Sequence, residues 1–405
     1  AQAAPRIQAL LLVFMPNLDV GSLGLQLLCA FSWCLSGVAS QYFSLGSGPV
    51  TLEKATVGRW SVDRVQAWSA GNSFRLGANY IPSMCSNAID MFDESTFESV
   101  LLGSERELRT AYATGFTTVR VFLHESLFFR RASAYLEDIS RFLTVLQRIG
   151  IVAMLVLFDA CWRPDLEDAH VIDGVHNSAW VQCPTHDVLR AFAVDEPWAV
   201  ERLRRYVTEV VTHFAEDMRV VVWDVYNEPS MRESEHWILP RLARLKGWSR
   251  HPDHWLLGGG KLEATFKLLR EAFVWARQAK PMQPLTAALW DFPAEQDEPD
   301  IAEWKLGFNR ALLDMSDIVS LHCYCDPDEL ESRLFELEEV GRGPVLVTEF
   351  MARPRNSTLV NSLPVLHRHN AWGYTWGLFN GRAQTHRHWE TWVRDDIAED
   401  AEWFH

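Results

Sequence analysis

From about residue 75 onward, the sequence alternates short apolar runs with longer stretches whose apolar residues recur every three or four positions. Runs such as 117–123 (TTVRVFL) and 151–158 (IVAMLVLF) are typical of buried strands, and residues 134–149 place their apolar side chains on one helical face. Strands that alternate with amphipathic helices indicate βαβ units and a parallel sheet. We therefore predict an α/β protein with a TIM (β/α)8 barrel.

The alternation continues through eight expected strands and the seven helices between them. The strands are expected at 74–80, 117–123, 151–158, 220–226, 284–289, 318–324, 345–350 and 372–379. The helices are expected at 105–114, 134–149, 197–214, 262–278, 301–315, 327–340 and 359–369. Long polar loops at 159–196 and 229–260 suit functional insertions above the barrel.

The sequence after the last expected strand does not clearly predict an eighth helix. Only 26 residues follow the last expected strand, with a weak helical pattern at 395–403. Either the eighth helix is incomplete because the chain is truncated, or the N-terminal segment covers the seam between the last strand and the first.

Residues 1–50 differ from the barrel domain, which we expect at 51–405. Residues 20–39 are uncharged and mostly apolar, which is about the length of a membrane span or a long signal core. We expect a secretory signal or a membrane anchor, and hence a secreted or membrane-anchored extracellular protein. A helix packed on the barrel is the alternative.

Net charge and tryptophan content limit the kinds of molecule that this protein is expected to bind. The formal net charge of −15 argues against nucleic acid and suits a neutral substrate. The 18 Trp are many for 405 residues, and Trp stacks on the C–H faces of sugars as well as filling cores. These features favour an oligo- or polysaccharide partner.

The seven cysteines do not form a recognisable site. Cys323 and Cys325 would share one face of a strand, but two thiols alone make a poor metal site. A disulfide between Cys161 and Cys183 is conceivable in a secreted protein, and scattered buried thiols are the alternative.

In a TIM barrel the active site lies at the carboxyl ends of the strands. Two glutamates, an Asp, two Asn, an Arg, two His, a Tyr and two Trp end the expected strands here, a set that core packing does not explain. The strand-end residues are Asn79, Arg120, His124, Asp159, Asn227, Glu228, Trp290, His322, Tyr324, Glu349 and Trp376.

Two glutamates at strand ends suit glycoside hydrolysis, which needs one carboxylic acid and one carboxylate. We assign Glu349 as nucleophile, kept ionised by Arg120 and Tyr324, and Glu228 as acid/base, with His322 beside it. No metal and no organic cofactor is implied, because His367 and His369, like His386 and His388, lack a recognisable ligand spacing. The remaining strand-end and loop residues are expected to contact substrate: Asn227, Trp376, His124, Asp159, Trp162 and Trp290.

Several of these strands resemble those of clan A glycoside hydrolases, especially family 5. The run VVVWDVYNEPS (220–230) is similar to that family's acid/base strand, LVTEF (346–350) to its nucleophile strand, and SLHCY (320–324) to its sixth strand. VRVF (119–122) matches the strand-two Arg, and Trp376 matches the Trp platform after strand eight. The resemblance covers about residues 75–392 and implies that Asn227 contacts the sugar 2-hydroxyl.

A narrower resemblance involves GANYIPS (77–83), FDACW (158–162), GVHNSAWVQ (174–182) and WGLFNGRAQTHRHWETW (376–392). These segments look like a subgroup variously labelled cellulase, xylanase or mannosidase, so they imply a reaction type and no particular sugar. In that subgroup the sequence continues beyond the Trp-Phe-His found here at 403–405.

The sequence therefore predicts a retaining β-glycoside hydrolase acting by double displacement. A transglycosylase with the same residues, a catalytically silent glycan-binding barrel and a metal-dependent barrel hydrolase are the alternatives. A pocket or short cleft, shaped by the two long loops, would favour short oligosaccharides.

Overall fold

The computed structural model describes residues 51–231, 260–294, 297 and 299–392. The apolar segment 20–39, most of the loop 229–260 and the weak helical pattern at 395–403 lie outside these residues. The signal or anchor expected at 20–39 therefore remains a prediction. The same holds for the two explanations given for the eighth helix. Among the described helices, none is both long and apolar enough to cross a membrane.

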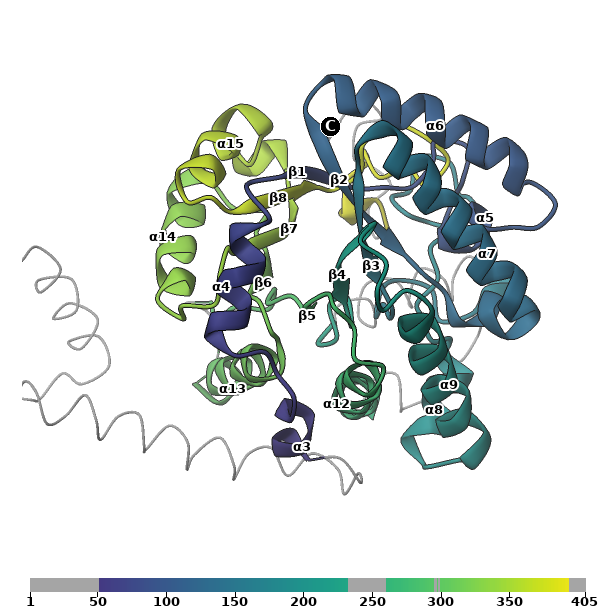
Figure 1. Cartoon of the computed structure of the whole chain (residues 1–405), viewed down its shortest axis with the longest axis horizontal. Coiled ribbons are helices and arrows are strands. Elements are labelled where there is room, and N and C mark those ends of the chain that lie inside the picture. Colours follow the sequence, from purple (N-terminus) through teal and green to yellow (C-terminus); the bar gives the residue numbers. More distant parts are fainter. Residues whose placement is uncertain (1–50, 232–259, 295–296, 298, 393–405) are drawn as a thin grey trace, which may run out of the picture. The chain divides into compact units, whose positions relative to one another are not determined.

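Eight strands form one parallel sheet in the order β5-β4-β3-β2-β1-β8-β7-β6. The gap between β5 and β6 is closed by Leu289, whose N–H donates to the carbonyl of Ser320 (2.9 Å) and whose carbonyl accepts from the N–H of His322 (2.8 Å). The strands are β1 (Leu76–Asn79), β2 (Phe116–Phe122), β3 (Val152–Val156), β4 (Val220–Asp224), β5 (Leu285–Thr286), β6 (Ser320–His322), β7 (Leu346–Phe350) and β8 (Trp372–Thr375). The predicted TIM barrel is confirmed, with helices around the strands (Figure 1).

The described helices are α3 (Leu52–Thr56), α4 (Val62–Ala70), α5 (Ala88–Met91), α6 (Phe97–Ala113), α7 (Glu125–Ile149), α8 (His186–Ala193), α9 (Pro197–His213), α12 (Gly260–Gln278), α13 (Pro299–Met315), α14 (Pro327–Glu338) and α15 (Leu359–Arg368). Short 3-10 turns are η1 (Leu166–Asp168), η2 (Arg353–Arg355) and η3 (Trp389–Trp392). All seven expected helices are present, and four start earlier than predicted. The start of α6 at Phe97 and of α7 at Glu125 is eight or nine residues early, whereas α12 and α13 each start two residues early. The expected loop 159–196 also contains α8, so it is not wholly irregular.

The strands are shorter than their apolar runs. The run 151–158 contributes only Val152–Val156 to the ladder, although Leu157 and Phe158 are also fully buried. The next residue, Asp159, forms an isolated parallel bridge with Asn227 and also pairs antiparallel with Cys183. Burial therefore extends beyond the strand at the mouth of the barrel, where apolar pattern alone cannot locate the strand end.

The N-terminal end of the barrel is covered by α4. Val65 of α4 and the preceding Trp60 belong to a buried cluster that includes Trp372 and Tyr374 of β8. Trp68 packs on the Trp372 ring at 5.6 Å between centroids. Because this end is filled in the described part of the chain, a ligand would enter at the opposite end.

The aromatic ring of Tyr374 requires a glycine on the neighbouring strand. A Cβ on Gly77 would lie 2.7 Å from Tyr374 Cδ1 and 2.5 Å from Thr118 Cγ2. A larger residue at this position of β1 would therefore displace side chains inside the barrel.

The cysteine pairing differs from the one considered from sequence. Cys323 and Cys325 form a disulfide, with Cα atoms 5.1 Å apart. The disulfide considered between Cys161 and Cys183 is not formed, because both residues are free, buried thiols, as the alternative predicted. Their sulfur atoms face different partners: Cys161 Sγ contacts Glu228, whereas Cys183 Sγ accepts from the N–H of Glu125 (3.4 Å).

Candidate active site

Arg120 of β2 is the centre of the polar network at the mouth of the barrel. Its side chain is fully buried and donates five hydrogen bonds. Nη1 donates to Asn79 Oδ1 (2.7 Å) and Glu349 Oε1 (2.8 Å), and Nη2 donates to Asn227 Oδ1 (2.6 Å) and Asp224 Oδ2 (2.7 Å). Nε also bonds Asp224 Oδ2 (3.0 Å). Burial opposes the charge, but the Asp224 and Glu349 carboxylates outweigh it and raise the pKa of Arg120.

Glu349 in β7 has a donor on each oxygen. Arg120 Nη1 bonds Oε1, and the Tyr324 hydroxyl donates to Oε2 at 2.6 Å. Burial, with the nearby Glu228, raises the pKa of Glu349, whereas His322, Arg120 and Tyr324 act in the opposite direction. Tyr324 stays a neutral donor, since burial and Glu349 raise the pKa of its phenol well above the usual value. Both donors favour the ionised form of Glu349, the form that a nucleophile requires.

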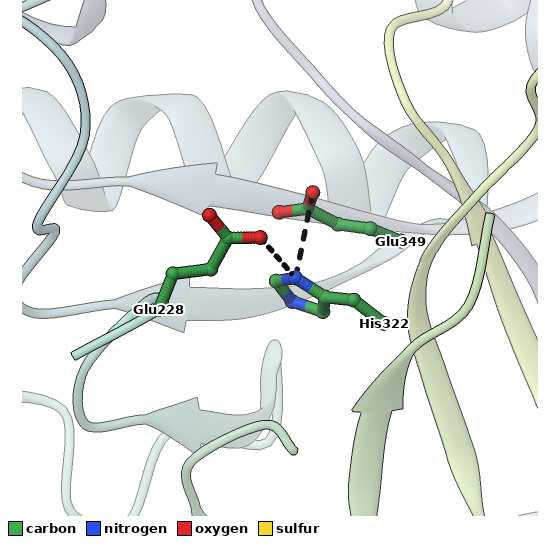
Figure 2. Close-up of side chains that lie close together, drawn as sticks. All are labelled: Glu228, His322 and Glu349. Atoms are coloured by element: carbon green, nitrogen blue, oxygen red, sulfur yellow. Dashed lines mark hydrogen bonds and ion pairs between the residues drawn. The ribbon is translucent and has the colours of Figure 1, made fainter. Parts of the chain in front are cut away.

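Glu228 follows β4 and faces Glu349 across His322. Its Oε1 lies 2.7 Å from His322 Nδ1, and the Cys161 thiol donates to its Oε2 at 3.2 Å. The same His322 nitrogen is 3.6 Å from Glu349 Oε2, and Figure 2 shows both carboxylates pointing toward the imidazole. Burial lowers the pKa of His322 to about 4, so the ring is neutral at pH 7. The hydrogen bond between Glu228 and His322 then contains one proton. When Glu228 is ionised, His322 Nδ1 carries the proton and donates it; when Glu228 is protonated, its carboxyl donates to Nδ1.

The two carboxylates are close together. One oxygen of Glu228, one oxygen of Glu349 and one nitrogen of His322 all lie within 4.8 Å of one another. Among the described residues, this is the only group whose geometry could also hold a metal ion. The histidine pairs His367–His369 and His386–His388 belong to no such group.

A cavity of about 960 Å³ opens above these residues. Most of the predicted site residues line it: Asn227, Glu228, His322, Tyr324, Glu349, Trp162, Trp290 and Trp376. His124, Asp159 and the fully buried Arg120 are not among the lining residues. Trp389 lines the cavity as well, so four tryptophans surround the two carboxylates, an arrangement that would suit a sugar ligand.

Asp159 lies behind the cavity wall. Its Oδ1 accepts from Asn227 Nδ2 (2.9 Å) and from the N–H of Cys161 (3.0 Å), and its Oδ2 accepts from Trp180 Nε1 (2.6 Å). The carboxylate thus orients the Asn227 amide and the start of the long third loop. This placement gives the expected substrate contact of Asp159 no support.

His124 is also buried and serves the start of α7. Its Nδ1 accepts from the N–H of Ser126 (3.2 Å), and its Nε2 donates to the carbonyl of Gln182 (3.1 Å). Burial lowers the pKa of His124 to about 4. The residue is a helix cap in a dry environment, away from the cavity.

This environment predicts acid sensitivity. The pKa of His124 is about 4 in the folded chain, below its value in the unfolded chain. Between these two pKa values, His124 is therefore protonated in the unfolded chain and neutral in the folded chain. The stabilisation is complete above the unfolded pKa and is lost as pH falls toward the folded one, by about 2 kcal/mol at pH 5. His124→Asn keeps a capping acceptor without a titratable group. We expect urea unfolding at pH 7.5 and pH 5 to show a smaller loss for this variant; an equal loss would mean that His124 titrates normally.

Several site residues escaped the sequence prediction. Asp224 carried a signal, because a carboxylate inside an apolar strand needs a buried partner. Cys161 adjoined predicted residues, but nothing in its type indicated a contact with Glu228. His176 and Trp389 also line the cavity. Both lie in segments of the narrower resemblance (174–182 and 376–392), but the sequence prediction singled out neither residue.

No protein-family model matches the sequence, and neither does any curated protein. Several solved structures with similar folds are named as mannosidases, mannanases or glucosidases. An exo-β-1,4-mannosidase from Opitutaceae bacterium strain TAV5 is 19% identical over 76% of this chain and 52% of its own, with a TM-score of 0.44. A GH5_18 protein from Streptomyces cattleya, in complex with GlcNAc, is 15% identical over 75% of this chain and 70% of its own, with a TM-score of 0.46. A β-1,4-mannanase from the sea hare Aplysia kurodai is 13% identical over 81% and 95%, with a TM-score of 0.47.

This chain spans about half the length of the mannosidase. The reaction of this protein is inferred below from the geometry of its site.

Proposed function

We propose that this protein is a retaining β-glycoside hydrolase of the family 5 type, with Glu349 as nucleophile and Glu228 as acid/base. One observation carries the proposal: oxygens of the two glutamates lie within 4.8 Å of each other at the mouth of a TIM barrel. Retaining enzymes separate their carboxyl groups by about 5–5.5 Å, and inverting enzymes by about 6.5–9.5 Å. The short separation leaves no room for a water between carboxylate and sugar, so it favours direct attack.

The surroundings support this division of roles. Glu349 accepts from Arg120 and Tyr324, and both donors stabilise a carboxylate. Glu228 shares one proton with a neutral His322, which suits a group that must give and take a proton. Asn227, held by Arg120 and Asp159, presents a fixed amide to the sugar 2-hydroxyl.

The reaction proceeds in two displacements. A Glu349 oxygen bonds the anomeric carbon while the glycosidic C–O bond breaks, and the Glu228 proton passes to the leaving oxygen. Water then enters, Glu228 removes its proton, the hydroxyl oxygen bonds the anomeric carbon, and Glu349 leaves as a carboxylate. The tryptophans of the cavity stack on sugar C–H faces during both steps.

Hydrolysis of aryl β-glycosides tests the proposal. We expect wild-type protein to cleave at least one of a panel of glucoside, mannoside, xyloside and galactoside. Proton NMR of the early product should show the β-anomer first, and added acceptor sugars should distinguish a transglycosylase by its larger products. An α-anomer formed first would exclude double displacement.

A chelator separates the acid/base proposal from a metal-dependent one. Because Glu228, His322 and Glu349 could geometrically hold a cation, EDTA is the control. We expect turnover to be unchanged by EDTA. Loss of activity that a divalent cation restores would overturn the assignment of Glu349 as nucleophile.

A further inference from the structure

Away from Glu228 and Glu349, the cavity is lined by several charged side chains. All but one of them form an ion pair or a hydrogen bond with another group of the protein. Asp291 pairs with Lys305 (2.9 Å). Asp326 caps α14 by accepting from the N–H groups of Asp328 and Glu329 (both 3.0 Å). Glu329 pairs with Arg333. In the described part of the chain, Arg355 alone among the acidic residues and arginines of the cavity has no side-chain ion pair or hydrogen bond.

Arg355 is held in place at the cavity wall. It ends η2, the turn that follows the nucleophile strand β7, and its N–H donates to the carbonyl of Ala352 (2.9 Å). Its guanidinium lies over the Trp389 ring at 5.1 Å, and Trp389 packs against Tyr324 at 5.6 Å between centroids. Tyr324 in turn donates to Glu349. The cation is therefore two side chains away from the proposed reaction centre.

Arg333 provides the contrast within the same cavity. Its guanidinium also lies over an aromatic ring, Phe292, at 3.9 Å. However, its Nη2 and Nε bond Glu329 Oε1 at 2.5 and 3.0 Å, so its charge is balanced inside the protein. The two arginines share a chemical type and an aromatic support, and they differ in pairing.

We propose that Arg355 binds an anionic group on the glycan, a carboxylate or a sulfate ester, so that acidic glycans are preferred over neutral ones. The inference rests on the proposed glycosidase function and names its substrate class. A guanidinium offers only donors and remains charged at any working pH, so its best complement is a charged acceptor. A carboxylate or a sulfate can accept two parallel N–H bonds from it, whereas a hydroxyl uses one bond and none of the charge.

The size of the effect follows from the exposure of Arg355. The side chain is exposed, so salt and water weaken the pair, and the net charge of −15 opposes any anion at long range. We expect a preference of about fivefold in kcat/KM for an acidic over a neutral oligosaccharide. The preference should decrease as salt concentration rises.

The test compares Arg355→Gln, Arg355→Lys and Arg333→Gln with wild type. Substrates are tetrameric manno-, xylo- and cello-oligosaccharides, each unsubstituted, substituted with glucuronic acid, or sulfated. The acidic-to-neutral ratio of kcat/KM should fall about fivefold in Arg355→Gln, persist largely in Arg355→Lys, and remain at the wild-type level in Arg333→Gln. The uronate and sulfate series show which anion is preferred.

The remaining outcomes decide against the inference. An unchanged ratio in Arg355→Gln, or an equal fall in Arg333→Gln, would mean that no anion is bound at Arg355 specifically. If no glycoside is cleaved, the proposed function fails, and calorimetric titration of the same acidic and neutral oligosaccharides still tests Arg355. Binding that does not distinguish acidic from neutral ligands would then overturn the inference by itself.

Discussion

Glu349→Ala is expected to reduce kcat for a cleaved aryl β-glycoside by about 10⁴- to 10⁶-fold, because the first displacement loses its nucleophile. The barrel should remain folded, since alanine removes a carboxylate that burial disfavours, although it leaves one Nη1 contact of Arg120 unfilled. Added azide can enter the vacated space and attack the anomeric carbon from the side that Glu349 occupied. The product would be the glycosyl azide of inverted, α configuration, detected by NMR.

Controls for this prediction lie in the same cavity. Glu329→Ala removes a glutamate from the wall, away from the proposed centre, and should change kcat by less than about twofold. Glu228→Ala should also lose activity, but azide should then yield the β-configured azide, because Glu349 still forms the intermediate. If azide gives the same anomer with both variants, the roles of the two glutamates have been assigned wrongly.

Arg120→Met is expected to lower the free energy of unfolding by about 3–5 kcal/mol. The substitution removes the cation that pairs with the buried carboxylates of Asp224 and Glu349. Each carboxylate then lacks both the hydrogen bonds from Arg120 and its compensating positive charge. Urea unfolding followed by tryptophan fluorescence measures the change. A loss below about 1 kcal/mol would mean that the network is solvated and unlike the one described.

Two further variants isolate the cause. Arg204→Met breaks an exposed pair with Glu201, in which both side chains are about half exposed, and should cost less than about 1 kcal/mol. Arg120→Met combined with Asp224→Asn removes one of the stranded charges. Its loss should be smaller than the sum of the two single losses, because the two positions are in direct contact.

The barrel was predictable because its signals are local and repeated. Each buried parallel strand carries its own apolar run and each covering helix its own periodicity, so errors at single boundaries do not change the fold. The strand ends then indicate the site, since a TIM barrel brings them to one mouth. Six residues meet there because each lies in a strand or directly after one: Arg120, Asn227, Glu228, His322, Tyr324 and Glu349.

The missed features depend on contacts between segments that are far apart. Cys161 was considered as a disulfide partner of Cys183, but the turn at Asp159 directs its thiol to Glu228. His124 ends its strand run like a catalytic residue and instead caps α7, because the chain enters the helix immediately after it. Trp389 and Arg355 reach the cavity from two different loops, and loop paths are set by packing that a single sequence does not display.

The packing of α4 on β8 has a consequence for how the chain folds. Trp68 and Trp372 are 304 positions apart in the sequence, yet their rings are in contact. When α4 leaves the ribosome, its apolar face lacks two of its packing partners, Trp372 and Tyr374, until the last strand has been synthesised. Closure of the barrel is therefore a late event, and incomplete chains expose Trp60, Val65 and Trp68 to chaperones and to one another.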